Sequence, residues 1–222
     1  MTVDSMSQVV GSIQLIYTII TGLAIAEAFK QAVQENRPNQ EKHARTFKGW
    51  FECVYPSRFI SMIIFLVLAI PFFQGNQRYL YAQYLAPLHR PIPPHAISSF
   101  WLTFDGLVFT LEAGMFFVMS RSLSARRWQQ FYGVIVILML LDFIWAVTEK
   151  GHGTDVPDAW LWFDGLAVVI LSAIIAIDGL FVPYKKDQEL NLYSFLTVSV
   201  VAFIGLVYGY VYQLDYLIDP TS

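Results

Sequence analysis

The stretch Trp101–Leu107, WLTFDGL, recurs nearly unchanged later in the chain as Trp160–Leu166, WLWFDGL. Each copy stands at the start of a long apolar segment and places one aspartate, Asp105 or Asp164, inside that segment. Placing an aspartate in the hydrocarbon of a bilayer costs about 2.5–3.5 kcal/mol on insertion scales. Because the same local sequence places an acid there twice, we expect these carboxyl groups to serve a function.

The composition is that of a membrane protein. Hydrophobic residues make up 56% of the 222 residues and charged residues only 14%, and mean hydropathy is +0.50; a soluble domain carries about 25% charged residues. The net charge of -3 and the lack of a long basic run argue against nucleic acid as a partner. Cys53 is the only cysteine, which excludes an intrachain disulfide and a cysteine metal cluster.

Several apolar windows are long enough to cross a bilayer as helices, which takes about 20 residues each. They show no alternation of apolar and polar residues, which favours helices over strands. The sequence therefore predicts an all-α fold, in which residues 1–222 form one polytopic membrane domain, a bundle of six transmembrane helices at residues 9–29, 59–79, 98–119, 130–148, 159–182 and 192–214. Pro71 and the Gln74–Asn76 segment predict that the second helix kinks and ends early.

The distribution of Lys and Arg predicts the orientation of the chain. Most of the 14 basic residues fall in the loops after the first, third and fifth predicted helices, whereas Arg78, Arg90 and Lys150 fall on the opposite side. Loops rich in Lys and Arg stay in the cytoplasm, so we expect both termini outside. The first ten residues show no cleavable signal peptide. The chain is typical of small bacterial membrane proteins, so we expect it in the bacterial inner (plasma) membrane.

The two motif copies predict an internal repeat. The third and fourth predicted helices and the fifth and sixth would form two hairpins in the same orientation, related by an axis along the membrane normal. Tyr17–Leu23 places Thr21 where the other copies have aspartate, as in a degenerate third copy. The alternative explanation is that the two copies are similar by chance, because apolar segments are built from few residue types.

Four glycines are candidates for close helix packing. Gly106 and Gly165 belong to the two motif copies, and Gly205 and Gly209 form a Gly-x-x-x-Gly pattern in the last predicted helix. Small residues at this spacing let a second helix approach closely. The partner helix belongs either to the same chain or to a second copy, so a homo-oligomer is one of two alternatives.

Four acids inside the predicted spans are the candidate site: Asp105, Glu112, Asp142 and Asp164. Each aspartate is about one turn from a tryptophan expected at the outer boundary, which predicts a layer of three aspartates, and Glu112 is about two turns deeper than Asp105 on the same face. Without Lys or Arg in the span interiors, these groups must be protonated, hydrogen-bonded, solvated or paired with a mobile cation. This predicts an outward-facing acidic vestibule on a cation or proton pathway. The structural alternative is that aspartates near the interface reach the headgroups or stabilise helix starts.

No catalytic constellation is evident, so we expect a protein that is not an enzyme and has no metal or cofactor. The histidines all fall in predicted loops, which excludes haem ligation by paired transmembrane histidines. There is no P-loop, serine nucleophile motif or HExxH motif. His152 lies near Glu149, Asp155 and Asp158, but loop clusters of this kind are more often solvated than metal-binding.

Two functions remain. The first is a small cation- or proton-linked channel or transporter in the lipid bilayer, with the four acids on its pathway. The second is a non-transporting membrane scaffold, signalling or effector protein that binds a cytoplasmic partner through its basic loop, residues 30–58.

Overall fold

The computed structural model describes residues 3–34, 56–86, 99–123, 128–153 and 158–181, together with residues 199, 200, 202 and 204. Its long elements are α-helices, which confirms the all-helical prediction over these residues. They are α1 (Val3–Gln34), α3 (Pro56–Leu80), α4 (Ser99–Arg121), α5 (Trp128–Gly151) and α6 (Asp158–Phe181). The sixth predicted span, 192–214, lies almost entirely outside the described residues.

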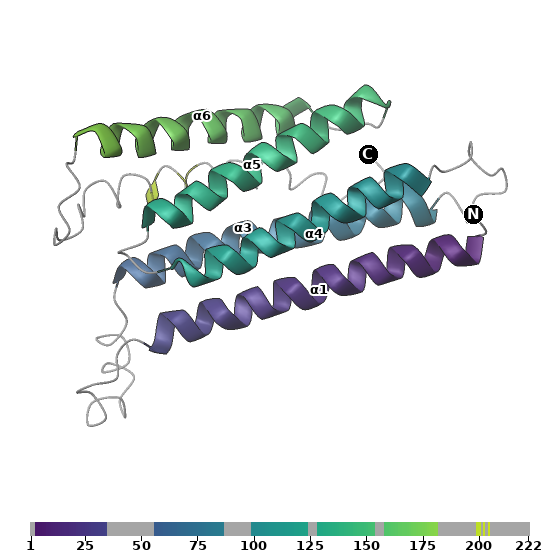
Figure 1. Ribbon diagram of the computed structural model, residues 1–222, viewed down its shortest axis with the longest axis horizontal. Helices are drawn as coiled ribbons and strands as arrows, with labels where there is room; N and C mark the ends of the chain where they lie inside the picture. The colour runs from purple at the N-terminus through teal and green to yellow at the C-terminus, as the bar shows by residue number, and fades with distance from the viewer. Residues whose placement is uncertain are drawn as a thin grey trace.

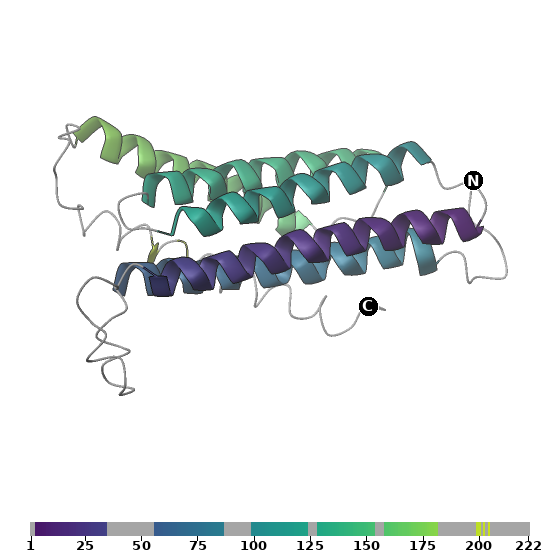
Figure 2. The same cartoon turned by 60° about the horizontal axis from the view of Figure 1, so that its bottom comes forward.

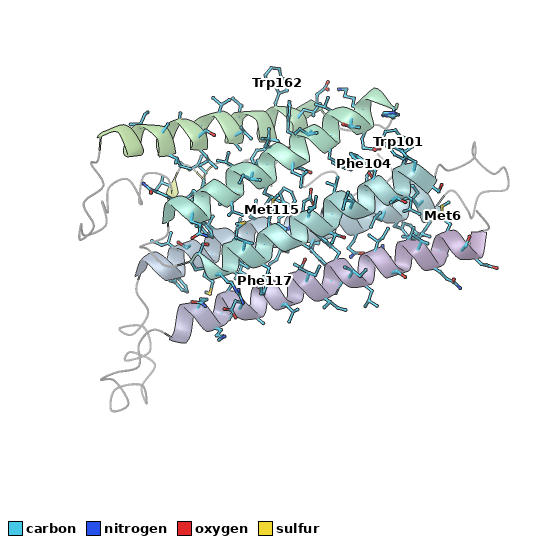
Figure 3. All side chains as sticks on the ribbon, in the orientation of Figure 1. Met6, Trp101, Phe104, Met115, Phe117 and Trp162 are labelled. Carbon is cyan, nitrogen blue, oxygen red and sulfur yellow. The ribbon has the colours of Figure 1, made fainter. Side chains whose placement is uncertain are left out.

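Four of these helices are long and apolar enough to cross a membrane, over Asp4–Ala32, Phe59–Leu85, Ser99–Arg121 and Gln129–Gly151. In α6 the apolar stretch is shorter, Leu161–Ile177. Large apolar side chains cover the outside of the bundle: Trp162 is 71% exposed and points away from the other helices (Figure 3). An exterior this apolar is unusual for a protein surrounded by water and is expected for helices in lipid.

The second predicted helix does not end early, so that prediction is wrong. α3 continues through Pro71 to Leu80, and a π-helical segment, η1 (Tyr81–Leu85), follows it directly. Transmembrane helices tolerate proline because neighbouring groups satisfy the freed carbonyl. The polar Asn76 side chain is also bonded inside the bundle instead of marking a loop. The buried face of this helix follows steps of four residues, at Phe72, Asn76, Leu80 and Tyr84.

The helices lie side by side along one axis, in the order α6, α5, α4, α1, and α3 packs across α1 and α4 (Figures 1 and 2). We call the end at which α1, α4 and α6 begin, and α3 and α5 finish, the N-terminal end of the bundle. α4 contacts α1, α3 and α5. Its buried positions therefore follow alternating steps of three and four residues, at Leu102, Asp105, Phe109, Glu112, Phe116 and Met119.

A glycine explains the close packing of α1 on α4. A Cβ atom added to Gly106 would lie 2.7 Å from Cδ1 of Ile13, which is too close for two carbon atoms. At the equivalent position of the second motif copy, a Cβ on Gly165 would lie 3.6 Å from Phe143, an ordinary contact. The two glycines of the motif therefore have different surroundings. Gly205 and Gly209 lie outside the described residues.

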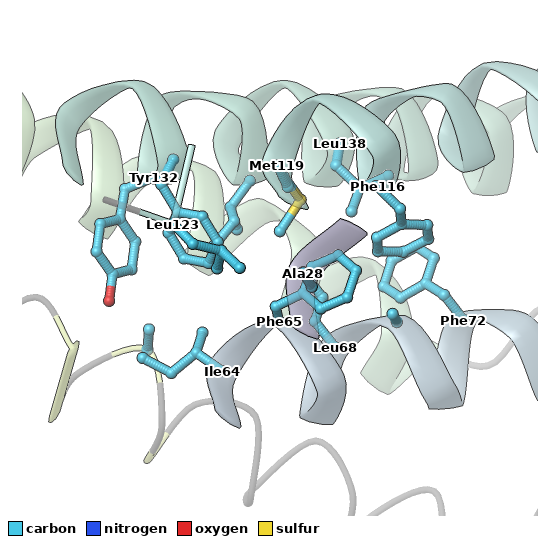
Figure 4. Packing of buried hydrophobic residues seen from close by; sticks show 14 of the residues in the cluster. Ala28, Ile64, Phe65, Leu68, Phe72, Phe116, Met119, Leu123, Tyr132 and Leu138 are labelled. Atoms are coloured by element: carbon cyan, nitrogen blue, oxygen red, sulfur yellow. The ribbon is translucent and has the colours of Figure 1, made fainter. Parts of the chain in front are cut away.

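The apolar core has two parts. The larger one lies away from the N-terminal end and contains aromatic rings from α3 and α4 packed edge to face (Figure 4). The ring of Phe116 lies 6.2 Å from that of Phe65 and 5.8 Å from that of Phe72, measured between centroids. The second part, toward the N-terminal end, includes Tyr17, Tyr84, Phe109 and Trp145. Asp105 bonds to Tyr84 and Trp145 of this second part, and Asn76 bonds to Tyr17.

Candidate functional site

All four acids named by the sequence face the interior of the bundle. The exposed fraction is 0% for Asp105, Glu112 and Asp164 and 1% for Asp142. Glu112 in particular faces the inside of the bundle and not its outer surface. The heptad-like spacing on α4 and α5 accounts for this at Asp105, Glu112 and Asp142, because it turns these three acids toward the same face as the apolar core residues.

The first group of polar side chains surrounds Asp105, and we call it the Asp105 group. The Tyr84 hydroxyl donates a hydrogen bond of 2.5 Å to Oδ2 of Asp105, and the Trp145 indole nitrogen donates one of 2.8 Å to Oδ1. The Tyr79 hydroxyl donates a bond of 2.6 Å to Oε2 of Glu149 and also interacts with Asp105. Tyr79 therefore links two acids on different helices.

The second group surrounds Glu112, and we call it the Glu112 group. Nδ2 of Asn76 donates a hydrogen bond of 2.6 Å to Oε2 of Glu112 and one of 3.1 Å to the Tyr17 hydroxyl. Asp142 and Asp164 belong to the same group, because Asp142 interacts electrostatically with Glu112 and Asp164 interacts with both. The Tyr17 ring stacks on Phe73, with centroids 5.7 Å apart.

The hydrogen bonding of the Glu112 group is incomplete. Among the described residues, neither oxygen of Asp164 has a hydrogen-bond partner, and Oε1 of Glu112 has none either. The Asp142 and Asp164 side chains approach each other across α5 and α6 without a well-formed hydrogen bond. The Asp105 group differs in this respect, since both oxygens of Asp105 accept bonds.

The three aspartates do not form the single layer expected from the sequence. Asp105 pairs with Trp145, whereas Asp142 lies about one turn further from the N-terminal end of the bundle and interacts with Asp164 and Glu112. The sequence prediction requires the tryptophans of the two motif copies to mark the same depth. The packing of α4, α5 and α6 instead places the two motif aspartates at different levels.

Glu149 was missed as a site residue by the sequence argument. It was assigned to a loop cluster with His152, but it is only 3% exposed and accepts the hydrogen bond of Tyr79. The signal was its spacing: Asp142, Trp145 and Glu149 follow steps of three and four residues on one face of α5. Asn76 and Tyr79 share one face of α3 in the same way. Asp155 of that cluster lies outside the described residues.

Asp105, Glu112 and Glu149 accept hydrogen bonds from uncharged groups. These groups are the side chains of Tyr79, Tyr84, Trp145 and Asn76. Ion pairs among the described residues join Lys30 to Glu27 and Lys150 to Asp158, on side chains that do not belong to either group. In the described part of the chain, no three His, Cys, Asp or Glu side chains are placed to hold one metal ion.

At the N-terminal end of the bundle, His152 is exposed just after α5 ends. Its ring centroid is 3.7 Å from that of Trp101, and its Nδ1 is 2.7 Å from the carbonyl oxygen of Thr148. Glu149, three residues earlier, turns into the bundle. An exposed ring just after the end of α5 therefore lies three residues beyond a buried acid.

Comparisons with protein families, with curated proteins and with solved structures found no match for this chain.

Proposed function

We propose that the protein is an integral membrane channel or transporter that moves a cation or proton through the helical bundle. The observation that supports this is the burial of Asp105 and Glu112 with uncharged hydrogen-bond donors, beside the buried Asp142 and Asp164. A Lys or Arg partner would neutralise a buried carboxylate permanently. Acids without one retain the capacity to bind a proton or a mobile cation, and such residues within membranes typically mark ion pathways.

The proposed pathway enters at the N-terminal end of the bundle. Glu149 and Asp105, joined by Tyr79, would receive the ion first. Glu112, about two helical turns beyond Asp105, would receive it next, together with Asp142 and Asp164. In the six-span orientation that we propose, both termini are outside, and this end of the bundle faces outward in the bacterial inner membrane. The hairpin repeat and a homo-oligomer packed through the last helix are further parts of this proposal.

Flux measurements in proteoliposomes test the proposal. Glu112→Gln and Asp105→Asn keep the size of each side chain and remove its ability to carry a charge, so we expect each to abolish most of the proton or cation flux. The matched control is Asp158→Asn, because that acid is exposed and pairs with Lys150 outside the polar groups. Equal flux through the wild type, both buried-acid variants and the control would refute the proposed pathway.

A non-transporting scaffold or effector is the second candidate, favoured by the basic loop at residues 30–58. Most of this loop lies outside the described residues. A cytoplasmic protein partner would then bind the loop, and the buried acids would act only as hydrogen-bond acceptors that hold the helices together. If the protein is a scaffold, replacing residues 36–54 with a neutral linker should abolish partner binding. If it is a channel or transporter, the same replacement should leave proteoliposome flux unchanged. Neither candidate requires catalysis or a cofactor.

A further inference from the structure

We propose that Asp142 and Asp164 share one bound proton, and that this proton site at the α5–α6 interface is the ion-binding step of the pathway. The role of this site in transport rests on the proposed function, and the inference identifies the transported ion as a proton. The site itself is assigned from the placement of side chains in the Glu112 group.

The unpartnered oxygens of Asp164 carry the argument. Asp164 is 0% exposed, interacts with Asp142 and Glu112, and has no hydrogen-bond partner for either oxygen among the described residues. A charged carboxylate in that position would lose its hydration and gain no donor in return. A proton bound to one of the two aspartates converts a pair of acceptors into a donor and an acceptor. It also removes one of the like charges, since two adjacent buried carboxylates cannot both ionise readily.

A second observation comes from α1. The contacts of Ile13 with Gly106 and of Tyr17 with Phe109 set the alignment of α1 with α4. Because the two helices run in the same direction, that alignment places Thr21 close to the level of Glu112. The Thr21 side chain is 3% exposed, and its hydroxyl has no hydrogen-bond partner among the described residues. Unsatisfied polar atoms therefore gather at one level of the bundle, as expected for a site whose occupant is small.

A proton fits this site better than a metal cation does. Hard cations bind through several converging oxygen ligands, six to eight in the case of calcium. In the described residues no three acidic or histidine side chains converge in that way. Two facing carboxyl groups are enough for a proton, because one oxygen is bonded to it and another accepts the hydrogen bond. On release the O–H bond on the aspartate breaks as one forms on Glu112, the neighbouring acid that can receive the proton.

Infrared spectroscopy of the full-length protein in lipid tests the site without relying on transport. A protonated carboxyl group has a C=O stretching band that is separate from the carboxylate bands and shifts in heavy water. We expect this band at neutral pH in the wild type and its loss in both Asp142→Asn and Asp164→Asn. Asp158→Asn, an exposed acid on the same helix as Asp164, should keep it. Thermal unfolding of each variant shows whether the bundle remains folded.

The outcomes separate this inference from the proposed function. A band that disappears in both variants supports the proton site, and proton flux that disappears with it supports the role in transport. If sodium, potassium or a divalent cation crosses the membrane and protons do not, the protein is still a cation transporter, but the identification of the ion as a proton is wrong. Carboxylate bands alone in the wild type, as expected if ordered water satisfies Asp164, would overturn the site. A band without any flux would support the site and refute the transport function.

Discussion

Nδ2 of Asn76 lies 2.6 Å from Oε2 of Glu112, so the deepest acid of α4 is held by an uncharged donor from α3. The same amide nitrogen lies 3.1 Å from the hydroxyl of Tyr17, which brings α1 into the contact. One asparagine side chain therefore connects three helices that are distant in sequence. It satisfies one oxygen of Glu112 and leaves the other without a partner among the described residues.

Removing the Asn76 amide should destabilise the bundle, and removing its acceptor as well should restore much of the loss. Asn76→Leu leaves Glu112 buried without this donor, which we expect to cost about 1–3 kcal/mol in the free energy of unfolding. Asn76→Leu combined with Glu112→Met replaces both partners with apolar groups and should be closer to the wild type. Denaturant titration in mixed micelles measures these values.

The control for this prediction is Gln74→Leu, because Gln74 is exposed on the same helix. We expect little change from it. A double variant that is less stable than Asn76→Leu alone would show that the hydrogen bond to Glu112 is not the reason for the loss.

Tyr84→Phe should weaken the Asp105 group. It removes the hydroxyl that donates to Oδ2 of Asp105 and leaves that oxygen buried, which we expect to cost about 1–3 kcal/mol in the free energy of unfolding. Tyr81→Phe is the matched control, because Tyr81 lies in the same π-helical segment and is 55% exposed. Thermal unfolding in detergent should separate the two variants. Equal melting temperatures would contradict the placement of Tyr84 on Asp105.

Gly106→Ala and Gly165→Ala should differ although they change the same residue of the two motif copies. The new methyl group at 106 meets Cδ1 of Ile13 at 2.7 Å and Cγ1 at 3.1 Å, so the Ile13 side chain must shift. Because Cδ1 is the flexible end of that side chain, we expect a loss of about 1 kcal/mol, the low end of the range for overpacking. At 165 the nearest side-chain atom is 3.6 Å away, so we expect no such loss. Adding Ile13→Val to Gly106→Ala removes the clashing atom and should recover stability. Similar unfolding free energies for the two alanine variants would show that α1 and α4 are not this close.

Cysteine labelling tests the proposed orientation and the number of spans together. In a Cys53→Ser background, Thr2→Cys and Ser222→Cys place a thiol at each end of the chain. We expect both to react with a membrane-impermeant maleimide added to intact cells, because six spans put both ends on the same side. Reaction at one end only would require an odd number of spans. If neither end reacts in intact cells but both react after lysis, the number of spans is even and the orientation is the reverse of the one proposed.

Much of the architecture could be predicted from local sequence. The five described helices coincide with predicted apolar windows, because the length and hydropathy of a segment are enough to favour a helix that can cross a bilayer. The spacing of Asp105 and Glu112 placed both on one face of α4, and both are buried. The wrong prediction for α3 came from reading Pro71 and Asn76 as local breakers when their effect depends on the helices around them.

Residue type and helical period are enough to predict that the chain forms apolar helices and that four acids lie within them. The partners of these acids depend on how the helices pack: Asp105 bonds to Tyr84 and Trp145, and Asp164 interacts with Asp142 and Glu112. This packing also brings Glu149 and Asn76 into the site. The physical reason is that the relative sliding of packed helices is set by contacts such as that of Ile13 with Gly106, which no periodicity within one helix encodes.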